Sequence, residues 1–251
     1  MEYGGSGDPR RSIELLWGVR EAPRRGPKPK LTQDQITRAA IALADSEGLS
    51  ALSMRRVAER LDVTAMSLYT YVPGKAELLD LMLDTVYGET ARPEPADGPW
   101  RARLEQVARE NWALYLRHPW LLQVATSRPV LGPRVIAKYD FDLGAVDGIG
   151  LTEIEMDLVI SVVTNYVHGA VRSAVEVAEA QSRTGLTDNQ WWEAYGPVLE
   201  KVFDPQRFPL AAAVGAAAGE EYQSATDPAR AFEFGLRLLL DGIETMVRER
   251  G

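Results

Sequence analysis

The sequence contains no cysteine and only two histidines, His118 and His168. Without thiols there is no disulfide, thiolate nucleophile or thiolate metal site, and two histidines leave little for a histidine-based one. No uninterrupted apolar run reaches the roughly 18 residues that a membrane span needs. The polar residues 1–9 lack the apolar stretch of a signal peptide. We therefore expect a cytoplasmic protein with no metal, no cofactor and no membrane partner.

Positive charge is in short supply: 28 Lys and Arg face 36 Asp and Glu, a net charge of -8 at pH 7. The balance is uneven along the chain. Residues 1–75 hold 12 basic and 9 acidic side chains, a balance of +3, and the remainder hold 16 and 27, a balance of −11. A basic end on an acidic body is typical of a protein that presents one end to phosphates. A solvated surface whose charges merely sort this way is the alternative.

Strand signals are also missing, because no segment alternates apolar and polar residues between turn residues. Ten segments instead show helical spacing, capping residues or helix-starting prolines, and we expect an all-α protein. Thr32 with Gln35 forms a capping-box pattern that recurs at residues 152 and 187. The expected helices are residues 32–48, 54–61, 65–71, 75–90, 100–117, 121–127, 133–146, 152–182, 187–203 and 228–248. Residues 205–226, rich in alanine and glycine, receive no assignment.

Prolines and charge divide the chain into three parts. Residues 1–31 form a basic, partly flexible N-terminal arm, in which prolines 23, 27 and 29 exclude a helix. Residues 32–90 form a small three-helix unit. Residues 100–251 form a larger helical domain beyond a linker that contains three prolines and a glycine. We expect a small helical head joined to a larger helical domain.

The most informative segment is residues 53–75, SMRRVAERLDVTAMSLYTYVPGK. Two short helices separated by a three-residue turn must cross closely, and Ala58 provides the small residue that a close crossing needs. The second short helix then has a free face that is small and polar enough to enter a DNA major groove. That face carries Ala65, Met66, Ser67, Tyr69 and Thr70. Three small helices in an ordinary bundle are the alternative.

Residues 32–89 resemble the DNA-binding domain of the tetracycline repressor (TetR) family. The resemblance is carried by EGL at residues 47–49, the SMRRVAERLDV helix, the MSLYTYVPGK segment and the ELLDLMLD continuation. The C-terminal part resembles the family's effector domain only in helix count, length and pattern. Asp62 departs from the family, which usually has glycine at this left-handed turn position. Asp tolerates that conformation better than most residues, so we expect the turn to form.

The resemblance implies a role for each matching residue. Arg55 matches a second-helix side chain that reaches a base, often guanine, although a phosphate or solvent contact is the alternative. Ala65, Met66, Ser67 and Tyr69 match positions that face bases or adjacent phosphates; packing on the first helix is the alternative for Tyr69. The matching phosphate contacts are Thr64, Tyr71 and Lys75.

The arm carries Arg24, Arg25, Lys28 and Lys30 ahead of the first helix. A basic arm of this kind can lie in the minor groove beside the recognition site. A disordered solubilising tail is the alternative. The apolar patch at residues 13–19 lies too far upstream for the head, and docking on the body of either subunit is open to it.

The C-terminal part concentrates aromatic residues, and an effector site needs apolar walls with a few polar groups. Asn165, Tyr166 and His168 interrupt a long, otherwise apolar helix, where buried polar groups would need partners. Core packing is the alternative for all of these side chains. The ligand-contact candidates are Trp112, Tyr115, Trp120, Asn165, Tyr166, His168 and Trp191.

The family resemblance implies a homodimer built on two long helices of each subunit, here residues 152–182 and 228–248. The expected seam comprises Val171, Ala174, Val175, Ala178, Phe232, Phe234, Leu236, Leu239 and Ile243. Twofold symmetry would place two recognition helices roughly 34–36 Å apart on a palindromic operator.

Taken together, the sequence predicts a ligand-responsive transcriptional repressor that binds double-stranded DNA and is released by a small-molecule effector. Two rivals are weighed against it. A helical enzyme would need a catalytic constellation, and neither a paired-carboxylate spacing nor a Gly-rich phosphate loop is found. A DNA-binding protein without a ligand would have a filled C-terminal core.

Overall fold

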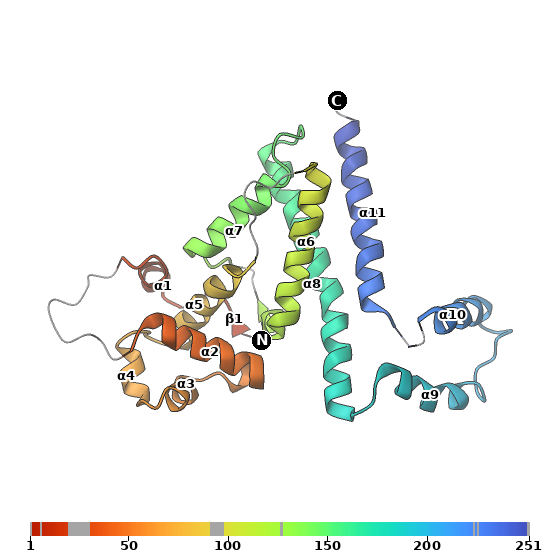
Figure 1. Ribbon diagram of the computed structural model, residues 1–251, viewed down its shortest axis with the longest axis horizontal. Coiled ribbons are helices and arrows are strands. Elements are labelled where there is room, and N and C mark those ends of the chain that lie inside the picture. The colour runs from red at the N-terminus through yellow and green to blue at the C-terminus, as the bar shows by residue number, and fades with distance from the viewer. Residues whose placement is uncertain are drawn as a thin grey trace.

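The computed structural model describes residues 2–5, 7–19, 31–90, 98–125, 128–222, 224 and 226–249. The fold is predominantly helical, as predicted, and the described residues add one pair of two-residue strands (Figure 1). A small head at one end comprises α2 (Gln33–Glu47), the 3₁₀ turn η1 (Leu49–Ala51), α3 (Met54–Arg60) and α4 (Ala65–Tyr69). Helix α5 (Lys75–Tyr87) leads from the head into the body. We use head and body in this sense below.

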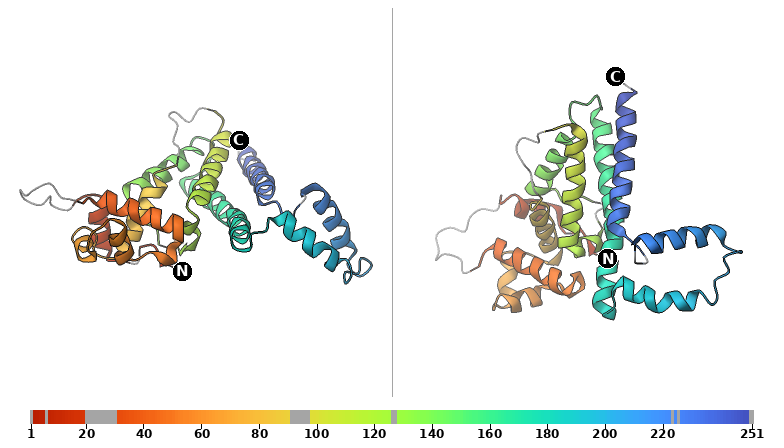
Figure 2. Two further views of the ribbon diagram at one scale, coloured as in Figure 1. Left: turned by 60° about the horizontal axis from the view of Figure 1, so that its bottom comes forward. Right: turned by 45° about the vertical axis from the view of Figure 1, so that its right-hand side comes forward.

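The body is built around three long helices that lie side by side (Figures 1 and 2). They are α6 (Trp100–Arg117), α8 (Glu153–Thr184) and α11 (Pro228–Arg248), and α8 packs against both of the others. Helix α7 (Pro133–Gly144) packs against α5 and α8, and thereby joins the entry helix to the body. The buried side chains form one continuous core that runs from the head into the body.

Local capping explains why the helices start where the sequence predicted. Thr32, Thr152 and Thr187 each form a complete capping box, with Gln35, Glu155 and Gln190 as the reciprocal partners. Asp227 caps α11 by accepting from the backbone N–H of Arg230. These predictions needed only residues that are neighbours in the chain, and they are confirmed.

The first 19 residues are more ordered than an arm where they are described. Strand β1 (Glu2–Tyr3) pairs in parallel with β2 (Val124–Ala125), and α1 (Pro9–Leu16) packs on α5. Buried Asp80 of α5 accepts hydrogen bonds from Gly5 N at 2.8 Å and Ser12 Oγ at 2.8 Å. Burial raises the pKa of this carboxyl, against the effect of both hydrogen bonds. The basic stretch with Arg24, Arg25, Lys28 and Lys30 lies outside the described residues.

Two segments differ from prediction. The segment expected as a helix over residues 121–127 forms the 3₁₀ turn η2 (Pro119–Gln123) and strand β2 instead. The strand forms because β1, more than 100 residues earlier, supplies its partner. The unassigned residues 205–226 contain α10 (Pro209–Tyr222).

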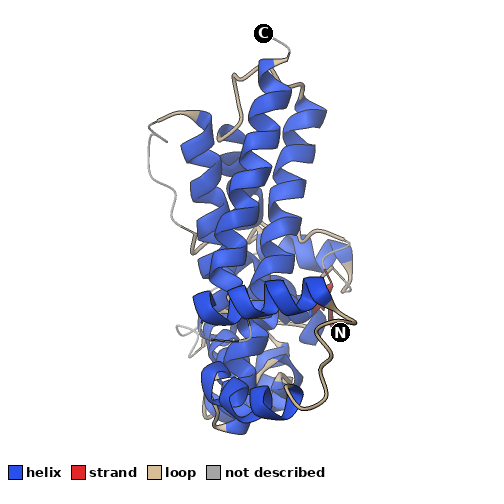
Figure 3. Ribbon diagram, turned by 90° about the vertical axis from the view of Figure 1, so that its right-hand side faces the viewer, coloured by secondary structure: helices blue, strands red, loops and turns tan. Residues whose placement is uncertain are grey.

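Helices α9 (Asp188–Leu199) and α10 project from the body as an extension (Figures 2 and 3). Neither helix has a buried residue, although Trp191, Tyr195 and Leu210 are large and apolar. Helix α8 likewise leaves apolar side chains in solvent. Among the described helices, α8 alone is long and apolar enough to cross a membrane, and 33% of its apolar 18-residue segment is buried. Such a single helix is weak evidence for a membrane.

Candidate nucleic-acid interface and effector domain

The head positions α4 through the residues beneath it. Leu68 is the buried residue of α4, and it packs in a core with Val57 and Ala58 of α3 and Ile36 of α2. Thr64 caps the helix by accepting from Ser67 N, and its hydroxyl also lies 2.9 Å from Ser67 Oγ. Because the inner side is fixed in this way, Met66, Ser67 and Tyr69 are exposed, and Ala65 is half-buried against the core.

The turn between α3 and α4 adopts the conformation that the sequence demanded. Asp62 has φ 53°, and among the described residues it is the only non-glycine with a positive φ. Val63 N donates to Ala58 O at 3.0 Å, which closes the turn against a residue whose small side chain permits the approach. The departure from glycine is therefore accommodated without loss of the turn.

Replacing Asp62 by glycine is expected to leave the head intact and to stabilise it by up to about 1 kcal/mol, because glycine has no steric penalty at positive φ. Replacing it by valine should destabilise the head by a similar or larger amount. Thermal unfolding of the two variants beside the parent protein measures this. A less stable glycine variant would contradict the prediction and would mean that the Asp62 side chain stabilises the turn.

The nine predicted DNA contacts lie on α3, on α4 and the residues beside it, and at the start of α5, and they differ in exposure. Met66 is 76% exposed and Tyr69 46% exposed, whereas Leu68 between them is fully buried. Arg55, Thr64, Ser67 and Thr70 are exposed as well, and Ala65, Tyr71 and Lys75 are half-buried. Lys75 is the first residue of α5, where the free N–H groups of a helix start also attract phosphate. The outer side of α4 is thus free of the protein itself.

Arg55 does not extend freely from α3. Its Nε donates to Glu59 Oε1 at 2.8 Å, one turn along the same helix, and both side chains are exposed. An exposed pair of this spacing is worth about 0.3–0.5 kcal/mol, so turning the guanidinium toward a base costs little. Arg55 stays a candidate base contact.

Four of the seven predicted effector residues belong to two aromatic groups, and the other three lie outside these groups. Trp112 stacks on Phe232 with ring centroids 4.3 Å apart, and Tyr166 stacks on the same ring at 6.1 Å. Tyr115 meets the edge of His168 at 5.5 Å. Burial raises the pKa of Tyr115, whose hydroxyl pairs with that of Tyr87, and burial lowers the pKa of His168.

The other three residues lie apart from these groups. Asn165 is exposed, so the expectation that it is buried and needs a partner is wrong. Trp120 is buried and donates from Nε1 to Asp45 Oδ1 at 2.7 Å. Trp191 stacks on Tyr195 at 4.3 Å in the α9–α10 extension. Helical spacing in the sequence does not distinguish an aromatic residue in the core, such as Trp120, from one in the extension, such as Trp191.

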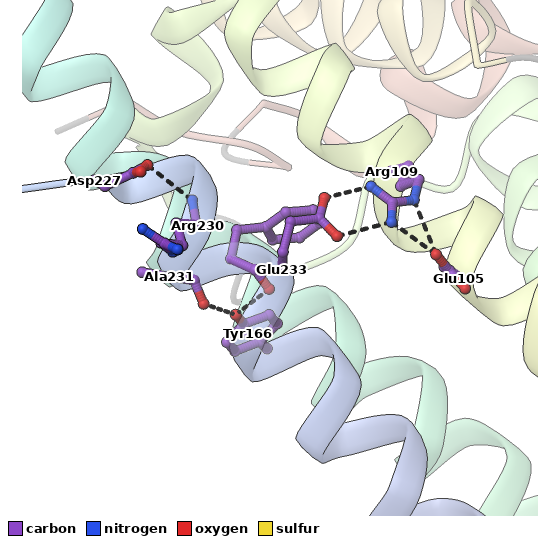
Figure 4. Close-up of polar contacts among 8 residues, drawn as sticks. Glu105, Arg109, Tyr166, Asp227, Arg230, Ala231 and Glu233 are labelled. Carbon is purple, nitrogen blue, oxygen red and sulfur yellow. Dashed lines mark hydrogen bonds and ion pairs between the residues drawn. The ribbon is translucent and has the colours of Figure 1, made fainter. Parts of the chain in front are cut away.

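Polar contacts hold α11 against α6 and α8 beside the first aromatic group (Figure 4). Arg109 of α6 binds Glu105 at 2.7 Å and also pairs with Glu233 of α11. The Tyr166 hydroxyl donates to Phe232 O at 2.7 Å, and a Cβ on Gly235 would lie 2.3 Å from it. Gly235 therefore permits the close approach of α8 and α11 at this level.

Sequence reasoning missed Asn111, which lies one turn before Tyr115 on α6. Its side chain is buried, and its Nδ2 has no hydrogen-bond acceptor in the described structure. Its spacing from Tyr115 was the available signal. A separate hollow of about 510 Å³ lies at the N-terminal end of α11, with Ser173, Tyr222, Arg230 and Phe234 among its lining residues; Asn111 is not one of them. The size of this hollow falls in the range of small-molecule sites.

A short helix with a free outer side, carried on a three-helix head above a larger helical body, defines a helix-turn-helix DNA-binding protein. Comparison with known proteins makes this more specific. The family model for the tetracyclin repressor-like C-terminal domain matches residues 92–247, and the model for bacterial regulatory proteins of the tetR family matches residues 36–82. The chain belongs to the TetR family of transcriptional regulators.

Individual relatives are similar to this protein over most of its chain. The HTH-type transcriptional repressor DrrR1 of Streptomyces coeruleorubidus is 48% identical over 99% of this chain and 90% of the relative. Apo ActR from Streptomyces coelicolor has 29% identity and a TM-score of 0.70, covering 90% of this chain and 100% of that one. ActR in complex with actinorhodin has 28% identity and a TM-score of 0.69, covering 87% and 99%. The boundaries predicted for the N-terminal arm, the head and the C-terminal domain stay predictions.

Proposed function

We propose that this protein is a homodimeric repressor that binds a palindromic operator through α4 and releases it when a small molecule occupies the body. The observation that carries the proposal is the outer side of α4, where Met66 and Tyr69 are exposed over a fixed core. Side chains on such a helix meet base edges in the major groove. The phosphate contacts are assigned to Thr64, Tyr71 and Lys75, which flank that side.

A second copy of the chain is the partner that best covers the exposed apolar side of α8 and α11. Leu158 and Val162 on α8 and Leu238 on α11 are exposed. They line a hollow of about 420 Å³ between the two helices. Two such pairs, related by a twofold axis, would form a four-helix bundle. A soluble dimer would also account for the apolar character of α8 without a membrane.

The predicted seam is wrong in part. Val171, Val175, Phe232 and Leu236 are buried inside one chain, so we assign them to the core. Phe234 and Ala178 are exposed, Ala174 is half-buried, and Leu239 and Ile243 line the hollow between α8 and α11, so these five stay candidates for the seam. The apolar side chains left free on the two helices are Ile154, Leu158, Val162, Phe234 and Leu238. Helical periodicity identified two apolar faces on α8 and α11 but could not assign them to core or partner.

For the effector we assign the region around Trp112, Tyr166 and the hollow at the N-terminal end of α11. Flat aromatic rings stacked on Phe232 and an unpartnered buried amide at Asn111 suit a ligand with both apolar and hydrogen-bonding groups. The ActR complex with actinorhodin supports a small-molecule site in a relative of this fold. Tyr115 and His168 contribute a second wall, and Asn165, Trp120 and Trp191 stay weaker candidates.

Selection of bound DNA from a random pool, repeated over a range of salt concentrations, tests the DNA role. The expected result is a palindrome with two half-sites about one helical turn apart, and a binding constant that falls steeply as salt rises. Single half-sites would argue against the dimer. Binding with no sequence preference would argue against α4 as a reading helix.

Met66 is expected to read thymine, because an apolar side chain in the major groove distinguishes bases by the C5-methyl group of thymine. Replacing the half-site thymines by uracil, which lacks only that methyl, should weaken binding about 5- to 10-fold at the position that Met66 contacts. With Met66→Ala the same replacement should have no effect. Competition binding of thymine and uracil operators measures both, and equal sensitivity in parent and variant would disprove the assignment.

A further inference from the structure

Of the two histidines, both of which the structure describes, His118 is the buried one, and it lies where the head meets the body. His118 ends α6 and is 4% exposed. Its Nδ1 lies 2.7 Å from Asp45 Oδ1 on α2, and its Nε2 lies 3.0 Å from Glu89 Oε2, just beyond the end of α5. One ring therefore connects three elements: the first helix of the head, the entry helix and the helix that carries Trp112 and Tyr115.

Both ring nitrogens must donate in this arrangement. A carboxylate accepts hydrogen bonds, and a neutral imidazole has a single N–H. Two carboxylates on opposite nitrogens are therefore both satisfied only by the imidazolium. Glu89 responds accordingly: burial would raise its pKa, but the hydrogen bonds from His118 and Arg117 prevail and the pKa lies below its usual value. Among the described residues, no cluster of acidic and histidine side chains is arranged to hold a metal ion.

The bridge is reinforced on the side of the body. Trp120 of η2 donates to the same Asp45 oxygen as His118, at 2.7 Å, and its ring lies edge-on to the imidazole at 6.1 Å. Tyr115, one turn earlier on α6, touches His168 of α8. Asp45 thus receives two donors from the end of α6 and the turn after it. Any displacement of this end would move Asp45, and with it α2, on which α3 packs.

We propose that His118, held by hydrogen bonds between Asp45 and Glu89, is the positioning residue that fixes the head on the body. Through this bridge, a shift of the C-terminal part of α6, which carries Trp112 and Tyr115, reaches α2 and changes the direction of α4. The proposal rests on the proposed function for its consequence, the control of operator binding. The bridge itself is a property of one chain.

The absence of cysteine makes a direct test practical. Ser50→Cys in the head and Ala113→Cys on α6 are exposed positions for two spin labels in the full-length protein. Diluting labelled chains with excess unlabelled protein restricts the measured distances to those within one chain. The head–body distance distribution is then read whether or not the protein dimerises or binds DNA.

His118→Gln is expected to broaden the head–body distance distribution and to weaken binding of the selected operator at least 10-fold. His118→Arg, which retains a cation with several donors, should restore most of both. Arg117→Gln is the matched control: it removes a neighbouring, exposed cation from the same Glu89 but leaves the bridge, and should change operator binding less than twofold.

If His118→Gln does not fold, Glu89→Ala removes the acceptor at one end of the bridge, at a more exposed position, and should also broaden the distribution. A folded His118→Gln or Glu89→Ala protein with the parent distribution would overturn the proposal. So would a broad distribution that His118→Arg leaves uncorrected. Loss of sequence-specific operator binding by the parent protein, with its distribution narrow, would instead count against the proposed function.

Discussion

Replacing both Leu158 and Leu238 by glutamate is expected to convert the dimer into monomers and to lower operator affinity by about 100-fold or more. The two side chains are 54% and 56% exposed on the free side of α8 and α11, so the change leaves the core of one chain untouched. In a twofold dimer, each substitution would place carboxylates in an apolar seam without partners, where burial of a charge is costly.

The large effect on DNA follows from the loss of linkage between two heads. When one head of a dimer is bound, the second meets its half-site at a high effective concentration, a gain of about 100- to 10,000-fold. A monomer loses this gain even if its head is unchanged. Sedimentation velocity measures the association state, and titration with the palindromic and a single half-site duplex measures the two affinities.

Ile136→Glu is the matched control for this experiment. Ile136 is another exposed apolar residue, but it lies on α7, outside the α8–α11 side. It should leave both the association state and the operator affinity unchanged. A double glutamate variant that stays dimeric would place the partner contact elsewhere, and the α9–α10 extension, with its exposed aromatic residues, would be the next surface to alter.

The parts of this structure that were predictable from sequence depend on residues close together in the chain. The cap of α2 is set by Thr32 and Gln35, and the turn at Asp62 by the spacing of two short helices. The free side of α4 follows from the same spacing once Leu68 is placed inward. All of this lies within residues 32–69, in which local propensity and packing agree.

The rest depends on contacts between distant residues. Strand β2 exists because residues 2 and 3 pair with it, and no local pattern at residues 124–125 announces that partner. The bridge joins His118 to Asp45, 73 positions earlier in the chain, and to Glu89, 29 positions earlier. No local pattern marks any of the three residues as a partner of the others. Asn165 was placed inside because its helix is apolar, but α8 has one apolar side in the core and another in solvent. Periodicity finds faces but does not name their neighbours.

Phe232→Ala is expected to lower the free energy of unfolding by about 3–5 kcal/mol, the usual cost of removing a buried phenylalanine ring. Phe232 is 2% exposed and lies between the rings of Trp112 and Tyr166, so three helices lose a common contact. Urea unfolding at one fixed protein concentration measures the change. Phe208→Ala, at an exposed position just before α10, should change it by no more than about 0.5 kcal/mol.

The cavity left by the Phe232→Ala substitution also allows a test of where a ligand binds in the body. A cavity with apolar walls between well-packed helices stays dry and binds small aromatic molecules. Benzene should therefore raise the melting temperature of Phe232→Ala and leave that of the parent protein unchanged. If the variant loses little stability and ignores benzene, α11 has collapsed onto α6 and α8. The aromatic stack would then be an adaptable wall, and the effector site would have to be sought at the hollow around Arg230 and Tyr222 instead.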